Sequence, residues 1–136
     1  GSMTAIRPGG NGDVDKTHVT WSRRKVVPKK SSPLLLNGLL FMISDEGVAS
    51  CSDPLTGEIH WAERLGMKGQ CASSPIHASG RIYSFSSEGD CIVFKAHKDG
   101  LSILAHNKLP NGCMASPAVN GDSLLVRTKN SLYRFN

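Results

Sequence analysis

Short apolar segments of about five residues recur along the chain, each bounded by Gly, Pro, Asn or Ser. The segments 39–43, 81–85 and 123–126 are the clearest examples. Stretches of this length, rich in branched and aromatic residues and closed by turn formers, are typical of β-strands. Amphipathic helices need ten or more periodic residues, and Gly, Pro or Asn interrupts almost every such window. The pattern therefore predicts an all-β fold of short strands joined by tight turns.

This strand pattern repeats with a period of 42 residues. The dipeptide Ser-Pro begins at Ser32, Ser74 and Ser116, and each copy is followed by an apolar stretch, a Gly and a further strand. A period of 40 to 45 residues made of four short strands is typical of a β-propeller blade. The turns that close the second strands carry residues that tolerate a positive φ: Gly47, Gly89 and Asn130.

The repeat divides the chain into an N-terminal arm and three blades. We expect residues 1–16 to be a vector remnant, Gly1-Ser2-Met3, followed by an N-terminal arm. One spare outer strand should precede the blades and complement a C-terminal unit of three inner strands, so that the total is three four-stranded antiparallel blades. The expected ranges are 17–25 for the outer strand, 31–65 and 72–109 for two blades, and 114–136 for the three inner strands.

One segment carries a recognisable motif. Residues 51–61 read Cys-Ser-Asp-Pro-Leu-Thr-Gly-Glu-Ile-His-Trp, which resembles the A-x-D-x-x-T-G-x-x-x-W pattern of pyrroloquinoline-quinone-like (PQQ-like) propeller repeats. Cys51 departs from the family's small Ala, and the second blade keeps only Lys98-Asp99-Gly100 without a Trp. The chain resembles the carboxy-terminal blades of exported bacterial PQQ-like repeat proteins. It is also similar to the lipoprotein scaffold of the outer-membrane β-barrel assembly machine.

The motif has a structural interpretation. Asp53 and Thr56 can hydrogen-bond the turn backbone, and Gly57 permits the left-handed residue that reverses the chain. Trp61 is large enough to wedge between neighbouring blades, and the resemblance implies that this tryptophan docks one blade on the next. Trp21 lies in a related outer-strand segment, so we expect both rings to be largely buried at matching places in adjacent blades.

Candidate chemistry is sparse. Quinoprotein dehydrogenases resemble this repeat but carry a pair of adjacent cysteines, which this chain lacks, and the histidines show no metal-ligand spacing. We therefore expect no catalytic residue, no bound cofactor and no metal site. Ser32, Ser74 and Ser116 recur at the start of inner strands, and His77 follows one of these strands; all four are candidates for lining a central channel. The cysteines lack C-x-x-C spacing and are expected to be free, buried thiols: Cys51, Cys71, Cys91 and Cys113.

Charge and hydropathy add little to the prediction of partners or location. The net charge of +5 comes partly from a basic cluster at residues 23–30, which we interpret as a solvated strand end because no nucleic-acid motif accompanies it. No apolar run approaches the length of a membrane helix, so we expect no membrane insertion. The resemblance implies an exported or periplasmic protein, although the chain shows no signal peptide.

We expect a non-catalytic scaffold or binding module that offers a face or channel to a protein, peptide or glycan. One alternative is part of a quinoprotein-like oxidoreductase whose active site lies outside this chain, and another is an assembly unit without a ligand. Three blades cannot close a propeller, which needs at least about four, so we expect closure into a ring by strand exchange between chains. A nine-blade trimer is slightly favoured over a six-blade dimer, because its turn of about 40° is nearer the ~45° of eight-bladed relatives.

Overall fold

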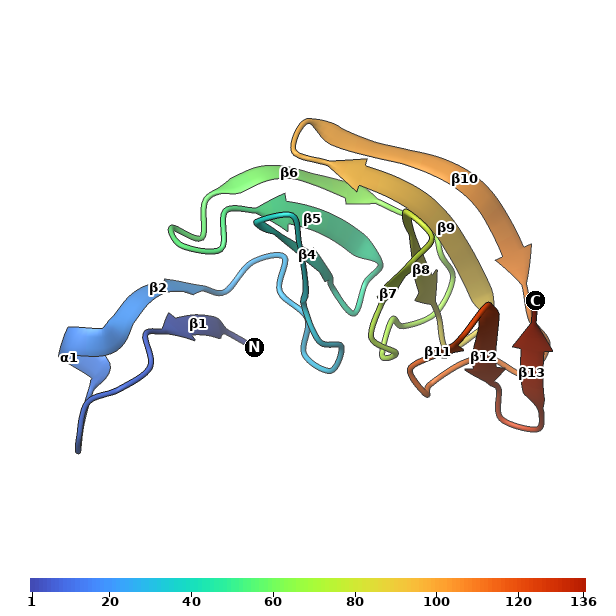
Figure 1. Cartoon of the computed structure of the whole chain (residues 1–136), viewed down its shortest axis with the longest axis horizontal. Coiled ribbons are helices and arrows are strands. Elements are labelled where there is room, and N and C mark those ends of the chain that lie inside the picture. Colours follow the sequence, from blue (N-terminus) through green and yellow to red (C-terminus); the bar gives the residue numbers. More distant parts are fainter.

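The computed structural model describes residues 1–136 and is almost entirely β-structure (Figure 1). Each sheet is antiparallel, and its strands follow one another in chain order. Blade 1 contains β3 (Leu34–Leu36), β4 (Leu39–Ile43), β5 (Val48–Ser52) and β6 (Ile59–Arg64). Blade 2 contains β7 (Ile76–Ala78), β8 (Arg81–Phe85), β9 (Asp90–His97) and β10 (Gly100–Lys108). Blade 3 contains β11 (Ala118–Asn120), β12 (Ser123–Arg127) and β13 (Leu132–Phe135).

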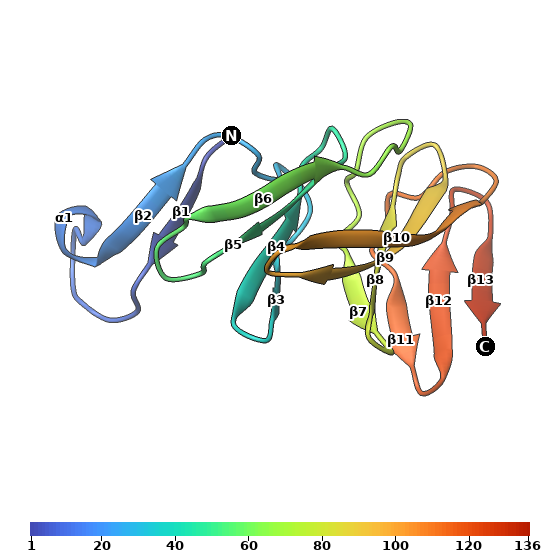
Figure 2. The same ribbon diagram turned by 90° about the horizontal axis from the view of Figure 1, so that it is seen from above.

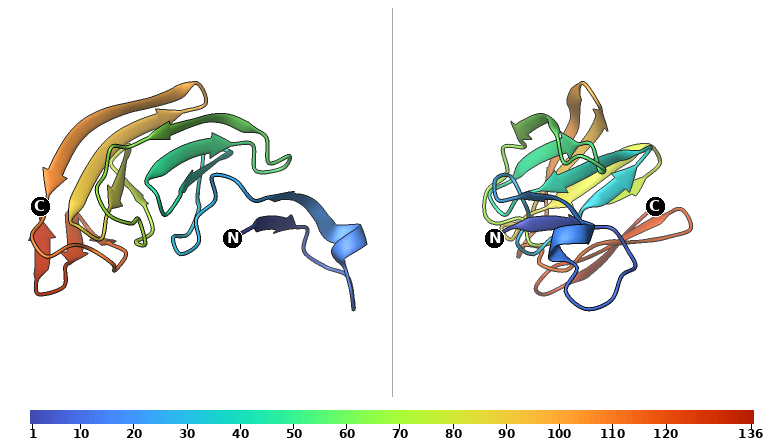
Figure 3. Two further views of the ribbon diagram at one scale, coloured as in Figure 1. Left: turned by 180° about the vertical axis from the view of Figure 1, so that it is seen from behind. Right: turned by 90° about the vertical axis from the view of Figure 1, so that its left-hand side faces the viewer.

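The blades stand side by side along an arc, as the view from above shows (Figure 2). The short first strands β3, β7 and β11 lie on the inside of this arc, and β6 and β10 lie on its outside (Figure 1). This is the four-stranded blade arrangement that the 42-residue period predicted. The N-terminal segment and blade 3 lie at opposite ends of the arc (Figure 3).

Two apolar clusters hold neighbouring blades together. The larger one joins blades 1 and 2 and includes Phe41, Ile43, Ile82 and Phe94, all fully or nearly buried. The smaller one joins blades 2 and 3 around Phe85. All four cysteines are buried and unpaired, which confirms that prediction. Alternating strand residues thus face the neighbouring blades, and burial of their apolar surface holds the arc together.

The N-terminal arm expected at residues 1–16 contains a strand that the sequence analysis did not predict. Met3–Ile6 forms a strand, β1, that pairs antiparallel with β2 (Val19–Arg23), and a single helical turn, α1 (Asp15–His18), precedes β2. The outer strand therefore begins two residues later than the expected start at residue 17. The chain contains thirteen strands in place of the expected twelve. A four-residue strand followed by a long polar loop carries too little local signal to be recognised before its partner is known.

No helix in the structure is both long enough and apolar enough to cross a membrane.

Candidate functional site

Trp21 contacts the turn between β5 and β6 of blade 1. Its indole Nε1 donates a hydrogen bond to the carbonyl of Pro54 at 2.9 Å. Its ring lies so close to Gly57 that a Cβ at that position would come within 2.6 Å of the indole, and Gly57 has a φ of 74°. Arg23 lies over the same ring, 5.8 Å from its centroid, and donates to the carbonyl of Gly57. The T-G turn of one blade thus receives the tryptophan of the preceding outer strand.

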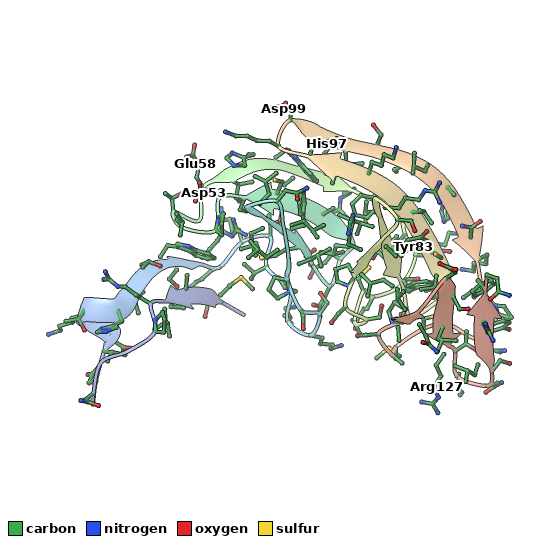
Figure 4. The ribbon with its side chains drawn as sticks, viewed as in Figure 1. Asp53, Glu58, Tyr83, His97, Asp99 and Arg127 are labelled. Carbon is green, nitrogen blue, oxygen red and sulfur yellow. The ribbon has the colours of Figure 1, made fainter.

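The turn itself is built by the motif residues. The Asp53 carboxylate accepts hydrogen bonds from the amides of Leu55 and Thr56, at 2.7 and 2.9 Å, and the Thr56 hydroxyl accepts one from Glu58. The Thr56 and Leu55 amides lower the pKa of Asp53, because they favour its ionised form. Asp53 and Glu58 mark the two ends of this turn in Figure 4. The local sequence therefore preforms the surface on which Trp21 rests.

Trp61 makes the equivalent contact one blade further on. Its Nε1 donates to the carbonyl of His97 at 2.8 Å, at the turn between β9 and β10, and its ring lies 6.2 Å from that of Phe41. Both tryptophans thus occupy matching places in adjacent blades. Trp21 and Trp61 are each partly buried. An outer strand lies at the rim of a blade, so part of each ring stays in contact with solvent.

The three recurrent serines form a ladder that connects the blades. The Ser32 amide donates to the Ser74 hydroxyl at 2.9 Å, and the Ser74 amide donates to the Ser116 hydroxyl at the same distance. This leaves the Ser32 hydroxyl at one end of the ladder and the Ser116 amide at the other end. Their 42-residue spacing arises because one amide–hydroxyl contact recurs at each blade junction.

The structure places His77 at the junction of blades 1 and 2. It lies on β7, is exposed, and lines a cavity of about 290 Å³ together with Leu36, Phe41 and His97. No group of three or more His, Cys, Asp or Glu side chains is positioned to hold a metal ion.

A larger cavity of about 630 Å³ lies at the junction of blades 2 and 3. Tyr83 and Val93 line it from blade 2, and Leu124 and Phe135 line it from blade 3. Figure 4 shows Tyr83 on the side of blade 2 that faces blade 3. The sequence analysis did not predict this cavity, which lies where two successive repeats face each other.

Register shows one difference between the two junctions. Trp61 lies opposite Cys51, and Cys51 lies opposite Phe41. In blade 2 the corresponding residues are Ala105 opposite Val93, and Val93 opposite Tyr83. Alanine therefore replaces the docking tryptophan at the junction of blades 2 and 3. The absence of a Trp in the second repeat was the available signal for this difference.

Blade 3 presents an unpaired edge beside this cavity. Strand β13 pairs with β12 on one side, and no fourth strand covers its other side. Leu132 and Phe135 on this strand are 72% and 43% exposed, and the Phe135 ring stacks on Tyr133 at 5.9 Å. Arg127, Lys129 and Arg134 are also exposed here, so the edge is cationic. An open edge of this kind is a template for pairing with another strand.

Asp90 is the most strongly engaged carboxylate. It is almost fully buried and accepts hydrogen bonds from the Lys108 ammonium at 2.8 Å and from the Lys68 amide. Burial acts to raise the pKa of Asp90, but the Lys108 and Lys68 contacts outweigh it and the pKa is lowered. Burial also raises the pKa of the Cys71 thiol to about 11 and that of the Cys91 thiol to about 12. The thiols are therefore protonated and poorly reactive, and Asp90 ties the blade-2 sheet to the preceding connection.

Comparison with known proteins identifies the fold. No protein-family model matches the chain, and no curated protein matches it by sequence. Among solved structures, BamB from Moraxella catarrhalis is similar over 87% of this chain, with a TM-score of 0.68 and 18% identity. A europium-containing methanol dehydrogenase is similar over 81% of this chain, with a TM-score of 0.55 and 15% identity.

The chain spans 36% of the BamB chain and 22% of the dehydrogenase chain. The two similarities agree with the arrangement of four-stranded blades described above. Together they show that this chain is an arc of blades with the fold of the PQQ-like repeat β-propeller.

Proposed function

We propose that this chain is a non-catalytic β-propeller scaffold that assembles by adding a strand from another copy to the open edge of β13. The observation that carries the proposal is the three-stranded blade 3, whose third strand lacks the outer partner that β5 and β9 both have. Added strands gain main-chain hydrogen bonds, and neighbouring pockets supply specificity for their side chains. The cavity lined by Phe135 lies where such a pocket is needed.

Strand β2 has the register that this edge requires. Trp21 and Trp61 hold equivalent positions on their outer strands. Trp61 lies opposite Cys51 on the third strand of its blade, and the residue at the same register position on β13 is Arg134. Adding β2 of a second copy in that register would pair Trp21 with Arg134 and Arg23 with Leu132. Trp–Arg is a favourable cation–π pair, and no like charges lie directly opposite each other.

Two inter-blade contacts would continue across such a junction. Trp21 already rests on Gly57 of its own blade 1, so an added β2 would place that blade next in the arc. The Ser116 amide could then donate to the Ser32 hydroxyl of the next copy, as Ser32 and Ser74 donate within one chain. A head-to-tail contact of this kind closes when the rotation divides a full turn. Two copies would give six blades and three copies nine, and the trimer needs the smaller distortion.

Light scattering over a range of concentrations tests the proposal. We expect a mass two or three times that of the 14.6 kDa chain, with a concentration-dependent midpoint. Leu132→Lys should weaken assembly by placing a cation opposite Arg23, whereas the matched Leu132→Glu variant should strengthen it. Leu132 is 72% exposed, so neither change should disturb the blade. A monomer at all micromolar concentrations would exclude self-assembly.

Two further experiments separate the remaining functions. Binding of an acidic extended peptide that competes with self-assembly would identify a peptide partner for the same cationic edge, whereas binding elsewhere would not. A spectral change on titration with pyrroloquinoline quinone and calcium would instead favour the quinoprotein alternative. A ring that binds no peptide, glycan or quinone would indicate a purely structural assembly unit.

A further inference from the structure

The N-terminal strand β1 occupies the place of a third blade strand. Ala5 lies opposite Trp21, as Cys51 lies opposite Trp61, and in both pairs the register shifts immediately afterwards. The shift skips Thr20 in one case and His60 in the other. The hairpin β1–β2 therefore reproduces the third and fourth strands of a blade, including its bulge.

The backbone groups used by β2 identify the edge that β1 holds. The His18 carbonyl accepts from the Arg7 amide at 2.9 Å, and the Glu58 carbonyl, also three residues before a tryptophan, accepts from the Asp53 amide at 2.9 Å. Figure 1 shows β1 on the side of β2 that faces the inside of the arc, as β5 does relative to β6. This is the same edge of β2 that β13 of a second copy would need.

We infer that β1 is a self-capping strand that competes with β13 of another copy for β2 and so limits assembly. This inference rests on the proposed strand addition, and it adds the step that controls it. Residues 1–136 contain two strands at the third-strand position without a further neighbour of their own, β1 and β13, and β2 is a fourth strand that either could pair with. Only one of them can pair with the inner edge of β2 at a time.

The structure indicates which of the two strands yields. Strand β1 has four residues, packs substantially against β2 alone, and leaves Ile6 57% exposed. A loop from Arg7 to His18, which includes α1, joins it to β2. Few apolar contacts besides those with β2 hold β1 in place, so β13 of another copy can displace it once the chain is concentrated enough to assemble. Strand β1 is therefore the element expected to leave.

The exposed pair Thr4 and Ser22 allows a direct test. The two residues lie opposite each other, with their hydroxyl oxygens 3.1 Å apart, so Thr4→Cys with Ser22→Cys can form a disulfide that locks β1 on β2. The four native thiols are buried, so the engineered pair should oxidise selectively. Three proteins are compared by light scattering: the full chain, a chain lacking residues 1–7, and the double-cysteine chain with and without reductant.

We expect removal of residues 1–7 to tighten assembly about tenfold or more, because the binding-competent fraction of β2 rises. The oxidised double-cysteine chain should remain monomeric, and reductant should restore the assembly of the full chain. Hydrogen exchange at residues 132–135 should slow only in the assembled proteins. Equal assembly of all forms, with each still weakened by Leu132→Lys, would overturn self-capping but retain strand addition. Failure of the shortened chain to assemble would overturn both.

Discussion

At the scale of single residues, the molecule depends on side chains that reach from one blade to the next. Trp21 and Trp61 each donate to a carbonyl in the turn of the following blade, and the indole ring covers the junction. Asp53 contributes indirectly, because it orders the turn that Trp21 contacts. The residue types were predictable from the T-G-x-x-x-W motif, whereas the acceptor carbonyls of Pro54 and His97 were not, since they come from distant turns.

Trp61→Ala should lower the free energy of unfolding by about 2–3 kcal/mol. This is less than the ~3–5 kcal/mol of a fully buried tryptophan, because the Trp61 side chain is only partly buried. Chemical denaturation followed by far-UV circular dichroism would measure the loss. Trp21→Ala is the matched control: it should release the β1–β2 hairpin, seen as faster hydrogen exchange at residues 19–23, while blades 1 and 2 remain folded.

Asp90→Asn should destabilise the chain by about 1–3 kcal/mol at neutral pH, because the amide keeps the Lys68 contact but loses the charge that pairs with Lys108. The pKa of Asp90 is lower in the folded chain than in the unfolded chain, where it is about 3.9. The ionised carboxylate therefore stabilises the fold above that pH, and this contribution is lost as the pH falls through the pKa of the folded chain. The difference between wild type and variant should therefore shrink below about pH 4. Urea titrations at pH 3 and pH 7 provide the comparison; an unchanged difference would contradict this role.

At the scale of elements, the T-G turn and the outer strands form one repeating unit. The turn between β5 and β6 presents Gly57 to the ring of Trp21, and the next turn, which ends at Gly100, presents the His97 carbonyl to Trp61. Outer strands carry a bulge at the same register in all three pairs of third and fourth strands. Bulges re-aim side chains, which explains how β2 and β6 point Trp21 and Trp61 at the following blade.

Gly57→Ala should weaken this unit by about 1–3 kcal/mol, since an alanine at a φ of 74° is strained and its Cβ would meet the indole of Trp21. Thermal unfolding and hydrogen exchange of β2 should both report the change. Gly38→Ala is a useful control for the strain alone, because Gly38 has a φ of 75° but open space at its Cβ position. Equal losses in the two variants would show that contact with Trp21 contributes nothing.

At the scale of the whole molecule, an open arc leaves one edge and one junction incomplete. The edge is that of β13, and the junction is that of blades 2 and 3, which holds the 630 Å³ cavity and has Ala105 in place of a docking tryptophan. Exposed apolar residues on this part of the molecule include Leu132 and Phe135. Unpaired edges flanked by apolar surface favour association, which agrees with the proposed assembly.

Removal of residues 1–25 should abolish the assembly that removal of residues 1–7 promotes. The longer deletion takes away β2 with Trp21, the strand proposed to pair with β13, whereas the shorter one removes only β1. Sedimentation velocity of the two shortened chains at equal concentration would compare them directly. Assembly that survives the longer deletion would show that copies meet through a surface other than β2.

Strand positions, the 42-residue blade period and the T-G turn were determined locally by the sequence, because turn formers and alternating apolar residues act over a few positions. The tertiary structure decided the features that join distant segments: the pairing of β1 with β2, the serine ladder, and the turns that accept the tryptophan hydrogen bonds. The cavity between blades 2 and 3 belongs to the same group, since it exists only where two blades face each other. Contacts between blades join residues about one 42-residue repeat apart, such as Ser32 and Ser74, and local patterns cannot identify such partners.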